Sequence, residues 1–311
     1  MNQVLRAQKS LAESCVISNV SELDHLLDEG KLRVCDMPTE IIMCRPDHFQ
    51  IPNKMHEINV HMINQAGKVN RVEALRQWVR LYETLKGLCD VYVVDAAERL
   101  HDMVFAANAG SAYVVDGKRV FILSNMLELT RQGEPRHYKR HLYRYGYDVM
   151  TLVSDLPFEG QGDMLPHPHA GVMYGGYGFR TRKEVYTEIS ALLGVPVILL
   201  ELVRPEFYHL DTAFCPLDNE TVLYYPEAFS LESREMIKKM FPRRIIVTHE
   251  EAMTFVCNAV VVGRNVVLPR GADRVGLILE EMGFVVHWVD MDQFLLSGGA
   301  AKCLTLHHYR R

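Results

Sequence analysis

A cysteine, a histidine, an asparagine and several carboxylates lie in short loops rich in glycine and alanine. The strings that contain them are FAANAG with Asn108, PFEGQGD with Glu159 and Asp163, FYHLDT with His209 and Asp211, and SGGAAKCLT with Cys303. Taken singly, each has an ordinary structural explanation: a turn asparagine, capping carboxylates, a core histidine or a buried thiol. Taken together, they form the set that covalent thiolate chemistry on a cation requires.

The cation that this set would suit is a guanidinium group. A guanidinium is planar and always charged, and paired carboxylates match its fork of N–H donors. A thiolate can attack its carbon, and a nearby cation can lower the pKa of the cysteine. A histidine can protonate the leaving amine and then activate water. His209 and Asp211 are two residues apart, so in an extended segment their side chains should share one face.

Composition limits the classes of protein that remain. The chain has 311 residues, a net charge of -5, and 48% hydrophobic and 23% charged residues. It can bury a sizeable core, and it has no basic field for nucleic acid or an anionic membrane. The longest uncharged apolar run, 191–200, is far shorter than the ~20 residues of a membrane span. The N-terminus has no apolar signal region, and seven cysteines without a CxxC pair favour a reducing, cytoplasmic compartment.

The pattern of elements predicts an α/β fold of one domain with several similar strand–helix units. Residues 1–38 are predicted to form an N-terminal arm with a helix near 20–33, and residues 39–311 the catalytic domain. Asn70 and Glu73 predict the start of a helix, as do Thr181 with Glu184 and Thr248 with Glu251. The predicted helices are 70–88, 135–145, one from 181 that ends before Gly194, 230–241 and 273–282, with another short helix beginning at Thr248. The predicted strands are 41–44, 91–95, 111–123 as a hairpin, 195–202, 245–247, 258–262, 265–268 and 284–289.

From about residue 41 to residue 306, these motifs resemble the guanidino-group modifying superfamily. That superfamily includes arginine deiminase, dimethylarginine dimethylaminohydrolase and glycine amidinotransferase. The resemblance implies the pentein fold, an α/β propeller of five ββαβ-type units around a central site. It also implies no metal and no organic cofactor.

The resemblance also implies roles for individual residues. FEGQGD is similar to a motif whose glutamate binds the guanidinium, so Glu159 takes that role, and Asp163 is counted among the substrate-binding groups. HLDT implies that His209 is the general acid/base and that Asp211 is a second guanidinium ligand. GGAAKCLT resembles the C-terminal nucleophile motif, so Cys303 is the implied nucleophile.

Asn108 departs from the aspartate that deiminases and dimethylarginine hydrolases carry at this point. With this asparagine, the motifs look most like the cyanobacterial-type arginine dihydrolases, which convert arginine to ornithine, two ammonia and carbon dioxide. In that group the asparagine is linked to the second hydrolysis. The alternatives are a deiminase or methylarginine hydrolase that stops after one step, or a propeller that only binds or assembles.

The same resemblance places three further residues at the amino-acid end of the substrate. Asn59 in HEINVHM would hold that end, and Arg131 in TRQGE and Arg180 in GYGFRT would hold its carboxylate. Here INVHM (58–62) and Asn125 differ from the expected pattern, as does the loop 164–175 with its His-Pro-His string.

Other signals favour no additional ligand. His167, His169, His307 and His308 lack carboxylate or cysteine partners at ligand spacing, so we predict solvated histidines and no metal site. The glycines at 175, 176 and 178 do not fit a dinucleotide-binding turn. The expected partner is a small molecule, arginine or a related guanidino compound. Neither nucleic acid nor membrane is expected, while a homo-oligomer remains open.

Overall fold

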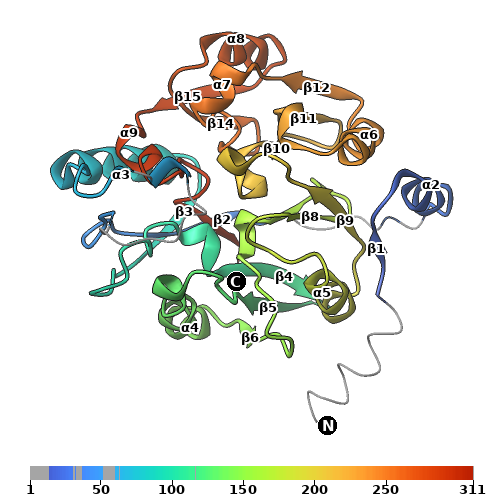
Figure 1. The fold of residues 1–311 in the computed structure, drawn as a ribbon, viewed down its shortest axis with the longest axis horizontal. Coiled ribbons are helices and arrows are strands. Elements are labelled where there is room, and N and C mark those ends of the chain that lie inside the picture. The colour runs from blue at the N-terminus through green and yellow to red at the C-terminus, as the bar shows by residue number, and fades with distance from the viewer. Residues whose placement is uncertain are drawn as a thin grey trace.

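Five small sheets surround a central axis in the computed structural model (Figure 1). The model describes residues 14–30, 32, 37–51, 60–62, 64–115 and 117–310. The bounds of the strands in chain order are β1 Val16–Ile17, β2 Glu40–Cys44, β3 Asp90–Val94, β4 Gly110–Val115, β5 Lys118–Leu123, β6 Asp148–Met150, β7 Met164–Pro166, β8 Met173–Tyr177, β9 Val197–Glu201, β10 Phe214–Pro216, β11 Thr221–Tyr224, β12 Arg243–Ile246, β13 Val260–Val262, β14 Asn265–Pro269, β15 Val285–Val289 and β16 Leu306–His308.

Each sheet repeats one topology. An antiparallel pair comes first, as in β4–β5, and a parallel pair follows, as in β5–β6. The same order recurs in β7–β8–β9, β10–β11–β12 and β13–β14–β15. The fifth sheet joins the two ends of the propeller, because β16 near the C-terminus pairs with β2, which pairs with β3. This is the pentein architecture that the resemblance implies.

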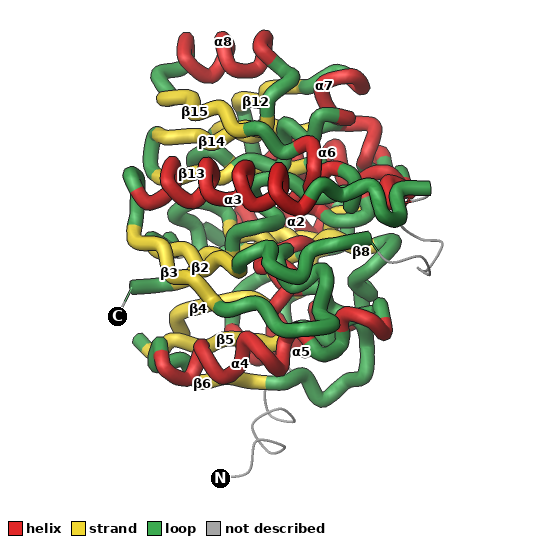
Figure 2. Tube along the Cα trace, turned by 90° about the vertical axis from the view of Figure 1, so that its left-hand side faces the viewer, coloured by secondary structure: helices red, strands yellow, loops and turns green. Residues whose placement is uncertain are grey.

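A helix carries each parallel crossover, because parallel strands cannot be joined by a tight turn. These helices lie on the outside of the sheets (Figures 1 and 2). They are α3 Arg71–Lys86, α4 Glu134–Arg144, α5 Val185–Leu193, α6 Leu231–Met240 and α8 Asp273–Glu281. Two short helices lie in connections between units: α7 His249–Met253 between β12 and β13, and α9 Asp292–Leu295 between β15 and β16. No helix within the described ranges is long and apolar enough to cross a membrane.

Helix ends follow the sequence signals in most cases. Asn70 caps α3 by accepting hydrogen bonds from the backbone of Val72 and Glu73. Thr248 and Glu251 form the predicted capping box of α7. The prediction that Thr181 caps a helix is wrong, since α5 begins at Val185 without a side-chain cap. The Thr181 hydroxyl instead donates to Asp163 Oδ2 at 2.6 Å, because a buried carboxylate needs a donor.

The N-terminal segment is joined to the propeller. Strand β1 pairs in parallel with β9, and helix α2, Val20–Asp28, lies beside α6. Asp24 pairs with Lys239 at 2.6 Å. The predicted helix of the arm is therefore present but ends earlier than residue 33. Whether residues 1–38 form a separate unit stays a prediction.

Candidate active site

The candidate residues occupy the same place in successive units, the turn that precedes the first strand. Single 3₁₀ turns cover Ala106–Ala109 before β4, Gly160–Gly162 before β7 and Leu210–Thr212 before β10. Asn258 lies two residues before β13, and Cys303 three residues before β16. Because the five units surround one axis, these five turns converge. Asn108 lies two residues before β4.

The thiol of Cys303 is buried, with 3% of the residue exposed, and is held from two sides. Asn258 Nδ2 donates to the sulfur at 3.1 Å, and the thiol lies 3.4 Å from Asp211 Oδ2. The other end of the Asn258 amide accepts from the backbone N–H groups of Ala300 and Cys303, each at 3.1 Å. Asn258 therefore orients both the sulfur and the loop that carries it. No role was predicted for Asn258 from the sequence, although it stands at the start of the predicted strand 258–262, next to a loop position.

The electrostatics of Cys303 differ from the sequence expectation. Burial, with the neighbouring Asp211 carboxylate, raises the pKa of the thiol well above its ordinary value. Bonds from Ala300 and Asn258 and the charge of Lys302 oppose this without offsetting it. In the free protein, the charge of Lys302 therefore does not give Cys303 a low pKa. A thiol with a raised pKa would react slowly with a labelling reagent even if it is the catalytic nucleophile.

His209 and Asp211 do not share one face. His209 itself is extended, but the chain turns over Leu210–Thr212, so the two side chains diverge. Nε2 of His209 lies 2.7 Å from Glu159 Oε2, whereas Asp211 contacts Cys303. Burial raises the pKa of Asp211 to about 6, against the charge of Lys302. The turn therefore divides the pair between two partners.

Glu159 is a fully buried carboxylate supported by donors. Leu127 N donates to Oε1 at 3.2 Å, and Arg180 Nη1 lies 3.4 Å from both oxygens. Burial alone would raise the pKa of Glu159, but Arg180, His209 and Arg131 together hold it well below its ordinary value. Glu159 is therefore an ionised group that can accept from a bound guanidinium.

Asp163 differs from Glu159 and Asp211 in its partners, although none of these three carboxylates lines the small cavity beside Cys303. One oxygen accepts from Thr181 and the other from Leu210 N at 3.0 Å. Its nearest oxygen is 4.0 Å from His209 Nε2. The geometry suits a residue that fixes the turn after His209 better than one that contacts substrate.

Asn108 connects the turn that carries Glu159 with the side chain of Arg131. Its Nδ2 donates to the Glu159 carbonyl at 3.3 Å, and its Oδ1 accepts from Arg131 Nη1 at 3.2 Å. The second glycine of the motif, Gly162, permits this approach, because a Cβ there would lie 2.4 Å from Asn108 Nδ2. Asn108, His209 and Cys303 all line one small cavity.

The outer wall of this cavity contains four charged groups, of which two were predicted from the sequence and two were not. Arg131 and Arg180 were predicted, whereas Asp102 and Glu128 were not. Arg131 is bound by Glu134 at 2.8 Å, and its Nη2 also lies 3.3 Å from the Asp102 carbonyl. No loop motif marks Asp102 or Glu128, which only the fold brings to the cavity. Asn59 lies outside the described residues.

Metal ligands are not assembled in the described part of the chain. No group of three or more histidine, cysteine or acidic side chains there could hold an ion. The prediction of solvated histidines is wrong for His167 and His308, which are both buried. His167 Nδ1 lies 2.8 Å from the Tyr174 hydroxyl, and His308 lies 3.5 Å from Glu40. Both rings are therefore part of the protein interior and not of a solvated surface.

The five-unit propeller and the convergence of a cysteine, a histidine and carboxylates define a pentein of the guanidino-group modifying class. The family model described as "N,N dimethylarginine dimethylhydrolase, eukaryotic" matches residues 45–310. The chain is 39% identical over 234 residues to N(G),N(G)-dimethylarginine dimethylaminohydrolase of Mycobacterium tuberculosis, covering 75% of each chain. The chain therefore belongs to the dimethylarginine dimethylaminohydrolase family.

Similarity to arginine dihydrolases is equally strong over the matched part. The chain is 39% identical over 268 residues to the bifunctional arginine dihydrolase/ornithine cyclodeaminase ArgZ of Synechocystis, covering 86% of this chain and 37% of that protein. It thus spans little more than a third of that relative. The substrate-bound structure of the N-terminal domain of ArgZ matches with a TM-score of 0.83 and 37% identity, over 88% of this chain and 98% of that one. An asparagine-to-serine variant of that domain is covalently bound to a reaction intermediate.

Proposed function

We propose that the chain is an arginine dihydrolase that converts arginine and two water molecules to ornithine, two ammonia and carbon dioxide. The observation that carries the proposal is the position of Asn108, which touches Glu159 and Arg131 and lines the cavity beside Cys303. The similarity to the N-terminal domain of ArgZ supports the same assignment. The proposed substrate contacts follow from the charges of the cavity.

The reacting end of arginine would lie between Glu159 and Asp211, with its carbon next to Cys303. The arriving guanidinium cation offsets the two carboxylates and lowers the pKa of the thiol, which supplies the thiolate. The sulfur forms a bond to the carbon, the C–N bond to one terminal nitrogen breaks, and His209 delivers a proton to the departing ammonia. Water then displaces the sulfur and leaves a ureido product.

A second hydrolysis of this ureido group would give ornithine. The ureido carbon is less electrophilic than the guanidinium carbon and carries no positive charge. A neutral amide can donate to the ureido oxygen, whereas an aspartate at position 108 would repel it. We infer that Asn108 retains and positions this intermediate for the second step.

The amino-acid end would be held by the outer wall of the cavity. Arg180 Nε is buried and has no hydrogen-bond partner among the described residues, so it is a free donor for a carboxylate. Arg131 is already bound by Glu134, which makes it the secondary contact. Asp102 Oδ1 is likewise buried without a partner in the described ranges, and an α-ammonium group would satisfy it.

The test is a product assay with arginine that quantifies ornithine, citrulline and ammonia together. We expect two ammonia per ornithine, no turnover by Cys303→Ala, and mainly citrulline from Asn108→Ser. Asn265→Ser is the matched control, because Asn265 lies in β14 and bonds His287 instead of the site. Citrulline with one ammonia from the unaltered protein would contradict the proposal, as would complete inactivity of Asn108→Ser.

The similarity to the mycobacterial dimethylaminohydrolase favours a second candidate, hydrolysis of N-methylated arginine to citrulline and a methylamine. The same assay with dimethylarginine separates the two. Release of methylamine at a higher kcat/KM than that of ammonia from arginine would support this candidate over the dihydrolase.

A further inference from the structure

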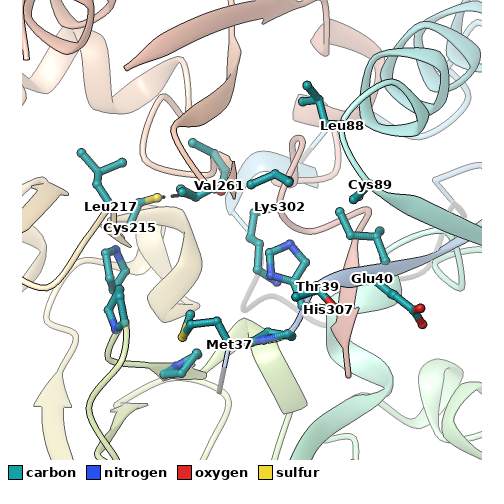
Figure 3. Close-up of a pocket in the computed structure, with 18 of the residues that line it drawn as sticks. Met37, Thr39, Glu40, Leu88, Cys89, Cys215, Leu217, Val261, Lys302 and His307 are labelled. Carbon is teal, nitrogen blue, oxygen red and sulfur yellow. Dashed lines mark hydrogen bonds between the residues drawn. The ribbon is translucent and has the colours of Figure 1, made fainter. Parts of the chain in front are cut away.

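A second cavity of about 880 Å³ lies at the other end of the first strands (Figure 3). The candidate active site is formed where these strands begin, whereas this cavity is lined by Pro166, Pro216 and Val262, where β7, β10 and β13 end. None of the residues that line one cavity lines the other. The second cavity is therefore separate from the site described above. Its volume lies in the range of small-molecule sites.

Lys302 extends from the candidate active site to the second cavity. Its backbone N–H donates to Asn258 O at 3.1 Å, beside the nucleophile, while its side chain lines the second cavity (Figure 3). The residue is only 6% exposed. Its ammonium group donates to Gln161 Oε1 at 3.3 Å and to Thr305 O at 3.2 Å, which are both neutral acceptors. No carboxylate among the described residues lies within ion-pair distance of it. A buried ammonium without an anion is costly, so an anionic partner would stabilise it.

Among the four cationic side chains of the lining, Lys302 is the one that is buried without a carboxylate partner among the described residues, whereas Lys86 is exposed to water. The lining contains four cationic side chains and three carboxylates, the histidines aside. Asp218 is paired with Arg264 at 3.5 Å, and Glu40 lies 3.9 Å from Arg310. Next to Lys302, the Nε2 atom of His307 is buried and has no hydrogen-bond partner in the described part of the chain.

Part of the cavity wall is apolar. Leu165, Phe214, Leu217 and Val261 lie along it, with the buried thiol of Cys215 among them. An inorganic anion would satisfy Lys302 but would leave these walls in contact with water. A ligand that joins one negative charge to an apolar body would satisfy both.

We propose that this cavity binds a small monocarboxylate with an apolar body, whose carboxylate accepts a charge-assisted hydrogen bond from Lys302. Such a ligand would also act on the nucleophile. The charge of Lys302 favours the thiolate form of Cys303, and an anion beside it would offset that charge. Occupancy would then lower turnover without competing with arginine. This second effect rests on the proposed function, whereas the binding itself does not.

The experiment is titration calorimetry of the full chain with 3-phenylpropanoate, with neutral 3-phenylpropanamide as the matched ligand. We expect the carboxylate to bind, the amide to bind at least about tenfold more weakly, and the affinity to be unchanged by saturating arginine in the Cys303→Ala variant. Lys302→Met should weaken carboxylate binding at least about tenfold. Lys86→Met, which removes a cation from the rim of the same cavity, should change it less than threefold.

Two results would overturn the proposal: no heat of binding at millimolar carboxylate, or binding that arginine displaces. Equal affinity for the amide would also overturn it, because the charge of Lys302 would then play no part. If Lys302→Met does not fold, Val261→Trp tests the site from its half-buried wall and should weaken binding by placing an indole ring where the apolar body would lie. Turnover in the presence of the carboxylate is measured separately, so failure of the arginine reaction leaves the binding result intact.

Discussion

The reacting end and the amino-acid end of the candidate site are built differently. At the reacting end, almost fully buried side chains form two close pairs: Asn258 bonds Cys303 at 3.1 Å, and His209 lies 2.7 Å from Glu159. At the amino-acid end, Arg180 Nε and Asp102 Oδ1 are buried without partners in the described ranges. The reacting end is thus preorganised by the protein, whereas we propose that a bound ligand completes the amino-acid end.

This difference has a physical reason. Groups that act on developing charge are most effective when they are fixed before the reaction, since no reorganisation is then needed. Groups that bind an ordinary ground-state charge need only be present and desolvated. Substitutions at the reacting end should therefore lower kcat, and those at the other end should raise KM.

The largest expected effect is that of Cys303→Ala. Loss of the nucleophile should lower kcat with arginine by at least about 10⁴-fold, because no other described thiol lines this cavity. Arginine binding, measured by calorimetry, should remain, since Glu159 and Asp211 are retained. Residual turnover above one per cent would exclude Cys303 as the nucleophile.

Asn258→Ala sharpens the comparison at the preorganised end. It removes the donor to the sulfur and the acceptor for the backbone of Ala300 and Cys303, so kcat should fall about 100-fold with little change in KM. Steady-state kinetics give this split, and Asn265→Ala serves as the control. A tenfold rise in KM at unchanged kcat would place Asn258 among the binding groups instead.

Arg180→Lys tests the other end. The lysine keeps the charge but loses the planar fork, so KM for arginine should rise about 10–100-fold with a smaller change in kcat. Arg131→Lys should instead lower thermal stability, because Arg131 forms a buried bidentate pair with Glu134. Equal melting temperatures for the two variants would remove this distinction.

The smallest expected effect is a pH dependence of arginine binding. Burial raises the pKa of Asp211 to about 6, so the carboxylate is ionised above that pH and neutral below it. Affinity of the Cys303→Ala variant for arginine should be full above pH 6 and fall up to about tenfold per unit below it. Asp211→Asn in the same background should flatten the profile. An unchanged slope would assign the titration to another group.

Local patterns predicted much of the fold. The cap at Asn70, the capping box at Thr248 and the stop at Gly194 each appear where expected, because they depend on neighbours within one turn. Short strands were missed, including β10 and β16, since three residues carry too little periodicity to be recognised. Thr181 was misassigned because its actual partner, Asp163, comes from an earlier turn of the chain.

The sequence by itself determined which chemistry was available, because the residue types and motifs of Cys303, His209, Glu159 and Asn108 are local. Only the tertiary structure decided which groups meet. It separated His209 from Asp211, placed Asn258 on the sulfur and raised the pKa of the thiol by burial. It also placed the side chain of Lys302, the residue next to the nucleophile in the sequence, on the wall of a second cavity. Such contacts join residues far apart in the chain, and they form only when the five units close around one axis.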